Sequence, residues 1–351
     1  MSRQIDVSQA IPVVPRQTLS RAGLIQLFIS VTLLSSAWPL TKVALQHGAA
    51  PLWFAEGRAA LSGLTAALLL APRGRLQLPR RGDLPVVAAV GLLQLGLYFA
   101  LSHLALVFVP AGRTSVLANT TTVWVVPLSL LVLRESIPLH RWVAALLGVL
   151  GIGVLISPWA IDWSAPGVLL GHALLLGAAL SWAVAIIVMR RFRASSTMFE
   201  LLPWCFLIAS VMLLGLILLE PSAHGVSPAI AYGFAPGTGA GIFPRTANGI
   251  ASGIIHAIWG DPIAWAALGY IGCIAGPLGT WCVMEATRLL PTVVSSVGFL
   301  ATPAVGIALS NLLLGERFTP DLLAGSALIL GGVAFAAWPG RGPATRLDRS
   351  R

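Results

Sequence analysis

The residues of this chain that could carry chemistry are few, and most of them lie inside long apolar runs. An indole or phenol ring offers a flat apolar face and one hydrogen-bond donor, which suits recognition of a small organic molecule. Rings packed in a core would give the same pattern, so packing and binding both remain open for this set. The candidate substrate-binding residues are Trp38, Tyr98, Asn119, Ser181, Trp182, Trp281 and Thr302.

A second set consists of ionisable residues in or near the same apolar runs. A charge within a membrane is costly and is usually kept for a function. Glu56, His103 and Glu285 are therefore candidates for carrying a proton whose movement is coupled to that of a substrate. A structural role is the alternative for each of them. The side chains of Glu56 and Arg58 could extend to the nearby interface, and Arg288, three residues after Glu285, could neutralise that acid. A single histidine such as His103 is usually part of a structural hydrogen bond.

The remaining motifs argue against catalysis and against metal or nucleic-acid binding. Cys205, Cys273 and Cys282 have no metal-ligand spacing and imply no disulfide framework. The sequence contains neither an HExxH motif nor an intramembrane pair of acids, so we expect no enzyme, no metal and no cofactor. The formal charge of +10 comes from bases scattered between apolar runs rather than from one patch, which argues against nucleic acid as a partner.

The elements that must position these side chains are membrane-spanning helices. Of the 351 residues, 57% are apolar and 10% are charged, whereas a soluble protein has about 25% charged residues. Runs of about 20 apolar residues, the length that crosses a bilayer, recur along the whole chain. The pattern predicts an all-α integral membrane protein with ten transmembrane helices at 22–43, 52–70, 84–106, 114–133, 142–156, 168–189, 201–219, 264–289, 293–314 and 322–338.

The end of each half of the chain follows one pattern: an apolar run, a short charged break and a second apolar run. Each break contains a glutamate, which we expect to cap the hairpin and set its register. A repeat of five spans is odd-numbered, so two tandem copies must face opposite ways, as inverted repeats do in secondary transporters. One constant offset in residue number aligns three pairs across the two halves, namely Pro110 with Pro291, Ser115 with Ser296, and Glu135 with Glu316.

The repeat also predicts the domain organisation and the orientation of the chain. We expect tails at 1–21 and 339–351, a first repeat at 22–159, and a second repeat at 168–338 with an external insertion at 220–261. With the first tail in the cytoplasm, 17 of the 22 bases fall on the cytoplasmic side and four on the other, and Arg58 lies within a span. Cytoplasmic loops carry the excess of basic residues, so both termini are expected inside, in the cytoplasmic membrane.

Two prolines mark interruptions in the predicted spans. Pro277 and Pro303 lie near the middle of the eighth and ninth spans, and Pro127 is a counterpart in the fourth. A proline within a helix leaves a backbone carbonyl without its donor. Helix breaks near the membrane midplane often mark the binding site of a transporter, so these positions are candidates for helix breaks beside the substrate.

Four segments carry a resemblance to a known family: SSAWPLTKVAL (35–45), PLWFAEGRAAL (51–61), LRESIPLHRWVAALLGVLGIGVLI (133–156) and LGERFTPDLLAGSALILGGVA (314–334). The chain resembles the drug/metabolite transporter superfamily, in its ten-span EamA-like branch, over nearly all of 22–338. The resemblance implies transport of small organic metabolites without ATP, often the export of amino acids or related compounds. It matches Arg58 to the family's second-span arginine and does not explain the external insertion.

We therefore expect a secondary transporter that moves a small organic metabolite by alternating access, with export favoured. Its partners would be the small-molecule substrate and the lipid bilayer, and proton coupling is a hypothesis. A passive channel or facilitator is the first alternative, and flux against a gradient separates the two. A non-transporting membrane scaffold is the second, but a scaffold would not need interior polar residues or broken helices.

Overall fold

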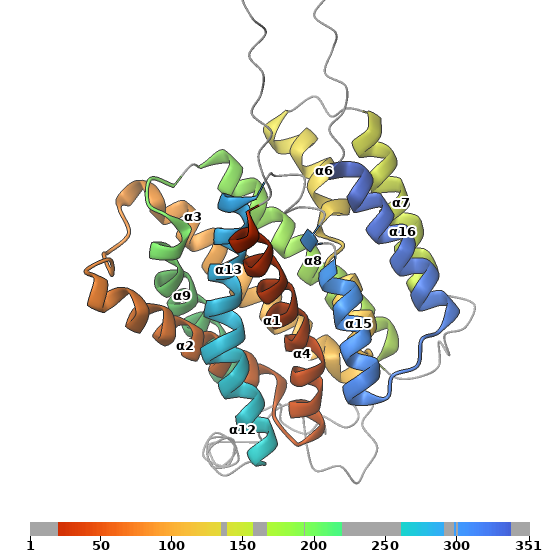
Figure 1. Cartoon of the computed structure of the whole chain (residues 1–351), viewed down its shortest axis with the longest axis horizontal. Coiled ribbons are helices and arrows are strands. Elements are labelled where there is room, and N and C mark those ends of the chain that lie inside the picture. The colour runs from red at the N-terminus through yellow and green to blue at the C-terminus, as the bar shows by residue number, and fades with distance from the viewer. Residues whose placement is uncertain are drawn as a thin grey trace, which may run out of the picture.

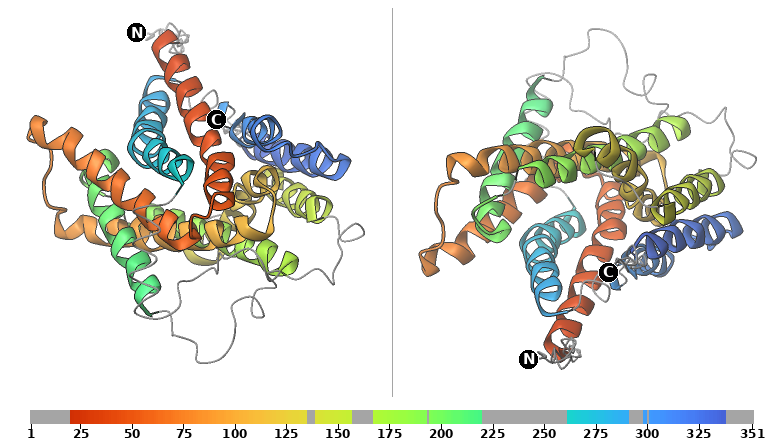
Figure 2. Two further views of the ribbon diagram at one scale, coloured as in Figure 1. Left: turned by 90° about the horizontal axis from the view of Figure 1, so that it is seen from below. Right: turned by 90° about the horizontal axis from the view of Figure 1, so that it is seen from above.

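The computed structural model describes residues 20–134, 139–156, 167–192, 194–219, 261–290, 298–299 and 301–337. These residues form helices and their connections and contain no strand, which confirms the all-α prediction. Figures 1 and 2 show the bundle from three directions. Two predicted features, the Glu135 break and most of the insertion at 220–261, lie outside the described residues.

The described residues of the first half form seven α-helices and a π-helical segment. The first two helices are separated by a short connection, and two 3-10 turns, Ala71–Arg73 and Arg81–Asp83, lead into the third span. Among the described residues, the helices of this half are α1 (Arg21–Gln46), α2 (Pro51–Leu70), α3 (Leu84–Ala88), the π-helix η3 (Ala89–Leu97), α4 (Tyr98–Phe108), α5 (Ala111–Leu117), α6 (Thr121–Leu133) and α7 (Leu139–Ile156).

The second half repeats this order with a second π-helical segment. Its described helices are α8 (Val168–Arg191), α9 (Met198–Leu219), α12 (Pro262–Gly269), the π-helix η4 (Tyr270–Ala275), α13 (Gly276–Leu289), α15 (Ala301–Leu314) and α16 (Pro320–Ala337). Over the described residues, six helical segments are long and apolar enough to cross a membrane. Four shorter apolar helices fall at the other four predicted spans, at Val123–Leu133, Ala145–Val154, Ala301–Leu314 and Pro320–Gly332.

Helix starts follow from local sequence signals. The Ser20 hydroxyl accepts a hydrogen bond from the Gly23 N–H at 3.3 Å and caps α1. Pro51 begins α2, where its missing N–H has no partner to lose. The Asp261 carboxylate accepts from the Ile263 N–H at 2.8 Å and caps α12. These caps fix where three of the predicted spans begin.

Helix boundaries in the two halves are related by two constant offsets in residue number. The first offset, which we call the early offset, relates the beginning of the two halves. Added to the first residue numbers of α1 and α2, it gives the first residue numbers of α8 and α9. The late offset is the one that sets Glu135 on Glu316. Under this offset the last residues of α4 and α6 correspond to the last residues of α13 and α15. Both bounds of α7 correspond to those of α16. The late offset is larger than the early one, so the segment between α9 and α12 is longer than the counterpart between α2 and α3.

The π-helical segments of the two halves are also related by the late offset. The π-helix η3 begins at Ala89, and η4 begins at Tyr270, its counterpart. The fourth span is broken by a turn at 118–120, between α5 and α6. Because π-helices are uncommon, the corresponding first residues of η3 and η4 support the repeat expected from the sequence.

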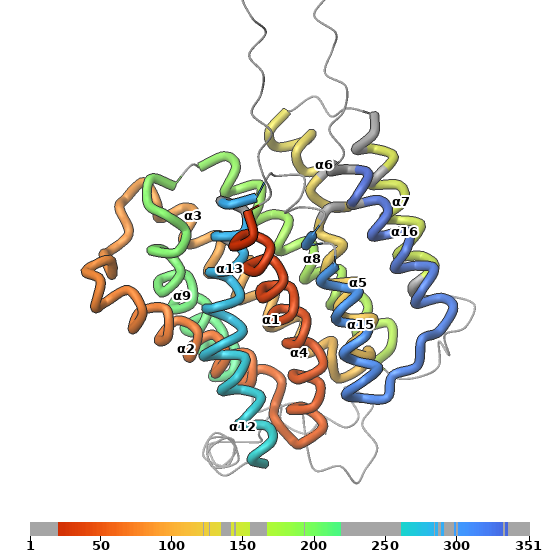
Figure 3. Tube along the Cα trace, viewed as in Figure 1, coloured from red at the N-terminus to blue at the C-terminus, as the bar shows by residue number. Residues whose placement is uncertain are grey.

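Helices of the two halves pack in a reciprocal pattern. In the first half, α1 packs against α13 and α15 of the second half, while α8 packs against α4 and α6 of the first. The pair α2 and α9 is in contact, and α7 lies along α16 (Figure 3). Each half therefore reaches across to the other, and residues from both halves meet in the centre of the bundle.

Candidate substrate site

Three of the sequence-predicted aromatic residues meet in the centre of the bundle. The Tyr98 ring, 7% exposed, lies 4.7 Å from the Trp182 ring and 6.3 Å from the Trp38 ring, measured between centroids. Both pairs are edge-to-face, with interplanar angles of 68° and 70°, an arrangement worth about 0.5–1.5 kcal/mol per pair. We call these three residues the aromatic cluster. They come from α1, α4 and α8, so both halves of the chain contribute.

The π-helix η3 is tied to the aromatic cluster through Ser181. The buried Ser181 hydroxyl donates to the Leu93 carbonyl in η3 at 2.7 Å, which joins α8 to the third span beside Trp182. A comparable bond serves η4, where the Ser62 hydroxyl of α2 donates to the Gly272 carbonyl at 2.9 Å. A π-helix displaces carbonyls from the regular ladder, and each serine hydroxyl adds a hydrogen bond to one carbonyl of such a segment. Ser181 therefore positions the site through the backbone.

A polar arm extends from the aromatic cluster toward α2. The Phe99 ring lies 6.2 Å from the Tyr98 ring and carries the Arg58 guanidinium over its face, 4.3 Å from the ring centroid. His103, one turn after Phe99, lies 5.8 Å from the Phe99 ring and 6.0 Å from the Phe54 ring. The polar arm thus consists of Arg58 and His103, arranged around two buried phenylalanines.

The three coupling candidates lie in different surroundings. The Glu56 carboxylate accepts a hydrogen bond from the Ser210 hydroxyl of α9 at 2.8 Å. The His103 Nδ1 lies 2.7 Å from the Phe99 carbonyl within α4. Glu285 lies half-buried on α13. Only His103 belongs to the polar arm, and a role in coupling stays a prediction for all three.

The other predicted site residues lie outside the aromatic cluster. The exposed Asn119 donates from its amide to the Ser115 carbonyl at 2.6 Å, in the turn between α5 and α6. The Thr302 carbonyl accepts from the Ser35 hydroxyl of α1 at 2.8 Å. Trp281 lies on α13 with 37% of its surface exposed. These residues do not belong to the aromatic cluster, and their contact with substrate stays a prediction.

The predicted helix breaks have different outcomes. Pro277 lies in the first turn of α13, directly after η4, so the eighth span is irregular at that point. Pro303 lies in the first turn of α15 (Ala301–Leu314), and residues 298–299 before it are also helical, so a break beside Pro303 stays a prediction. Pro127, in contrast, lies inside α6, and the fourth span is broken at 118–120 instead.

One end of the bundle holds the two halves together through Glu316; we call it the Glu316 end. The Glu316 carboxylate accepts from the Ala111 and Gly112 N–H groups at 2.7 and 2.8 Å, which caps α5. Arg113 and Asp321 form an ion pair beside it. Lys42 donates to the Leu106 and Val109 carbonyls at the end of α4. The structural role predicted for Glu316 agrees with this geometry, although it caps α5 rather than its own hairpin.

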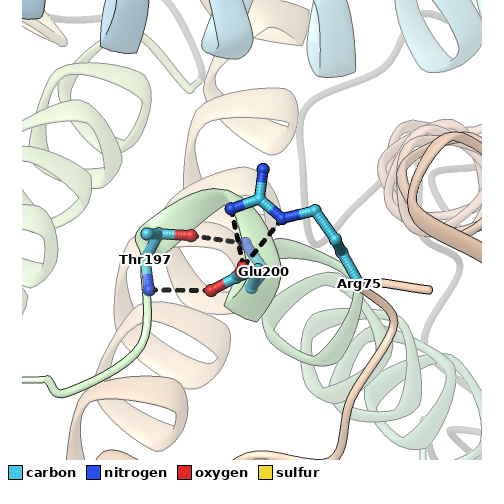
Figure 4. Close-up of polar contacts among 3 residues, drawn as sticks. All are labelled: Arg75, Thr197 and Glu200. Carbon is cyan, nitrogen blue, oxygen red and sulfur yellow. Dashed lines mark hydrogen bonds and ion pairs between the residues drawn. The ribbon is translucent and has the colours of Figure 1, made fainter. Parts of the chain in front are cut away.

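The opposite end is held through Asp83 and Glu200; we call it the Asp83 end. The buried Asp83 carboxylate accepts from the N–H and hydroxyl of Ser195 at 2.7 and 3.0 Å, and from the Ser196 hydroxyl at 2.7 Å. Glu200 pairs with Arg75 at 2.9 Å and accepts from the Thr197 N–H at 3.1 Å (Figure 4). Sequence reasoning missed these acids, and the available signal was their position in charged breaks between spans.

Comparison with known proteins identifies this arrangement. A sequence model of the EamA-like transporter family matches residues 21–157 and 246–338, more than half of the chain. The chain belongs to the EamA-like transporter family. The first matched range spans α1 to α7, and the second, which begins within the insertion predicted at 220–261, includes α12 to α16. The EamA-like chain is therefore a multi-pass membrane transporter, and the sequence-based recognition is confirmed.

Relatives extend the match along nearly the full chain. An uncharacterized transporter of Archaeoglobus fulgidus is 23% identical over 87% of this chain and 96% of its own. The uncharacterized transporter YdfC of Bacillus subtilis is 26% identical over 90% of this chain and 92% of its own. YvbV, another uncharacterized transporter of Bacillus subtilis, is 31% identical over 155 residues, about half its length. A solved crystal structure with 19% identity has a TM-score of 0.56 over 91% of this chain and 99% of its own, which indicates a similar fold.

Proposed function

We propose that this EamA-like protein is a secondary transporter that carries a small organic metabolite across the cytoplasmic membrane by alternating access. Export is the favoured direction, both termini lie in the cytoplasm, and the chain crosses the membrane ten times in two inverted five-helix repeats. The observation that carries the proposal is the aromatic cluster, because its three rings come from helices of both repeats. Transporter sites lie near the midplane at the repeat interface.

The depth of the aromatic cluster supports this assignment. Tyr98 lies ten residues before the end of α4 at Phe108. At 1.5 Å per residue this is about 15 Å, or half of a hydrocarbon core of about 30 Å. Three rings with a few polar neighbours provide the apolar faces and scattered donors that small-molecule sites usually have. The substrate would enter between the repeats and contact Trp38, Tyr98 and Trp182.

The two tied ends of the bundle provide a basis for alternating access. The Glu316 end and the Asp83 end each join the first repeat to the second through hydrogen bonds and ion pairs. Access from one side at a time requires that contacts at one end open while those at the other persist. α1 and α8 each pack against helices of the other repeat, so movement of one repeat against the other would change these contacts.

The proposal is tested by flux in proteoliposomes that contain the purified protein. The substrate is first identified by comparing metabolites inside and outside cells with and without the protein. Accumulation against its gradient is expected under an imposed proton gradient, whereas a passive channel would only equilibrate the solute. Trp182→Ala should lose at least ~90% of this flux, while Trp265→Ala, at a residue 41% exposed on α12, should retain it. Equal flux in both variants would place the site elsewhere.

A further inference from the structure

The Arg58 side chain points into the bundle rather than toward the membrane surface. Arg58 lies seven residues after the start of α2, about 10 Å along the helix axis. Phe99 lies nine residues before the end of α4, about 13 Å from the same end of the bundle. An arginine that extended to the interface would move away from this ring, yet the guanidinium lies 4.3 Å from its centroid. The interfacial role considered from the sequence does not fit this geometry.

Arg58 has no acidic partner among the described residues. Arg75 and Arg113 each pair with a carboxylate, whereas the Arg58 Nε atom is buried without a hydrogen-bond partner. Glu56, two positions earlier, binds Ser210 on α9 instead. Arg58 is half-buried, and the Phe99 ring attracts its guanidinium but does not neutralise it. A charge withdrawn from water is stabilised by a counter-charge. An anionic group from outside the chain would supply it.

His103 presents a second polar atom without a partner near the same ring. The Phe99 carbonyl can only accept, so the His103 Nδ1, 2.7 Å away, must donate to it. In the neutral imidazole the Nε2 atom is then an acceptor, and this atom is buried without a hydrogen-bond partner. The polar arm therefore offers a cationic donor and a neutral acceptor, each close to the Phe99 ring.

We propose that the polar arm is the subsite for an anionic group of the substrate: Arg58 binds a carboxylate, and His103 accepts a hydrogen bond from a neighbouring hydroxyl or N–H. The remaining, apolar part of the substrate lies against Trp38, Tyr98 and Trp182. This inference rests on the proposed function and adds the substrate class, a small carboxylic acid that carries a donor. A planar guanidinium with parallel N–H groups matches a carboxylate, which a lysine ammonium matches less well.

The test uses three probes of one shape: mandelate, which has a phenyl ring, a carboxylate and a hydroxyl; phenylacetate, which lacks the hydroxyl; and mandelamide, which lacks the charge. Binding to the purified full-length protein is followed by tryptophan fluorescence, which Trp38 and Trp182 report. We expect the native protein to prefer mandelate over mandelamide by at least ~10-fold. Arg58→Gln should remove this preference, and Arg58→Lys should restore part of it. His103→Phe should remove the preference for mandelate over phenylacetate.

The outcomes separate this inference from the proposed function. Concentrative flux of the identified substrate by the native protein, together with unchanged preference for mandelate in Arg58→Gln, would overturn the subsite and leave the transporter intact. Absence of flux by the native protein would overturn the proposed function itself. Failure of the native protein to bind mandelate better than mandelamide also contradicts the subsite. Arg113→Gln, which breaks an ion pair away from the cluster, is the matched control and should keep the preference.

Discussion

The two halves of the chain share several helix boundaries but differ in the side chains at their centres. The early offset, which sets α1 and α2 on α8 and α9, pairs Arg58 with Cys205 and Trp38 with Ala185. The late offset, which relates the later helices, pairs Tyr98 with Gly279. The backbone plan is thus present twice, whereas the polar and aromatic groups lie mainly in the first repeat. This difference separates residues needed for the architecture from the residues that we propose to recognise a substrate.

The same contrast occurs where the fourth and ninth spans end. Arg134 follows α6 with a φ of 52°, and its counterpart Gly315 follows α15 with a φ of 66°. Both residues adopt the left-handed conformation, which suits glycine and costs other residues about 1–2 kcal/mol. Arg134 is the only non-glycine residue with positive φ in the described part of the chain. The geometry of this helix end is therefore kept in both repeats even where the residue type does not favour it.

The largest expected effect comes from making the first repeat resemble the second at the site. Trp38→Ala gives the first repeat the residue that the second has at Ala185, and it removes one ring beside Tyr98. We expect transport to fall at least ~10-fold, because one wall of the proposed site is lost. Flux is measured in proteoliposomes and normalised to folded protein. The matched change Trp142→Ala, at a residue 41% exposed on α7, should have little effect, and an equal loss would contradict the contrast.

The next effect concerns the tie between the repeats at the Glu316 end. Glu316→Ala leaves the Ala111 and Gly112 N–H groups without their acceptors, and each bond to a charged group is worth about 1.5–3 kcal/mol. We expect a loss of about 2–4 kcal/mol in stability, read from thermal unfolding in detergent. Arg317→Ala, at the adjacent exposed position, is the control and should change little. Similar unfolding temperatures for the two variants would contradict the stabilising role of Glu316 at this end of the bundle.

A smaller pair of effects, opposite in sign, is expected at the left-handed helix ends. Arg134→Gly should stabilise the protein by about 1 kcal/mol, because glycine adopts a positive φ without strain. Gly315→Ala should destabilise it by about 1 kcal/mol; the new methyl would meet nothing within 4 Å, so only the backbone conformation opposes it. Thermal unfolding of both variants measures the difference. Shifts of the same sign would show that the two ends are not equivalent.

The smallest expected effect is a pH dependence at the start of α12. The Ile263 N–H and then His47, 2.7 Å away, hold the pKa of the exposed Asp261 carboxyl below its ordinary value of 3.8. A carboxyl with a lowered pKa adds stability that is present above pH 3.8 and is lost as the pH falls through the folded-state pKa. Asp261→Asn should therefore unfold at a slightly lower temperature at pH 7, and the difference should shrink as the pH falls below 3.8. A difference that grows on acidification would contradict this assignment.

The sequence predicted the correspondence between the two halves but not the irregular helical segments. The late offset, found from three residue pairs, correctly related the ends of α4, α6 and α7 to those of α13, α15 and α16. The two π-helices were not predicted, because AVGLLQLGL and YIGCIA share no motif and their geometry depends on packing and on the Ser181 and Ser62 hydroxyls. The break in the fourth span was expected at Pro127 and occurs at 118–120 instead.

That break has a local cause that the sequence contained. The Asn119 amide donates to the Ser115 carbonyl at 2.6 Å, and the Thr120 hydroxyl donates to the Leu117 carbonyl at 2.7 Å. Short polar side chains compete with the helix for backbone groups, so the run Asn119-Thr120 was the available signal. At the site, interior position selected Trp182 and Tyr98, whose rings do meet, together with Trp281, which lies apart from them on α13. The direction of the Arg58 side chain was not predictable, because it depends on Phe99 from another helix.

The most direct test of the account is the sidedness of the two breaks that end the fourth and ninth spans. In a background with Cys205, Cys273 and Cys282 replaced, single cysteines at Arg134 and at Arg317 are exposed to a membrane-impermeant maleimide in intact cells. If the two repeats have inverted orientations in the membrane, Arg317→Cys should react in intact cells. Arg134→Cys should react only after permeabilisation. Reaction of both cysteines from the same side would contradict the inverted repeat on which the proposed site depends.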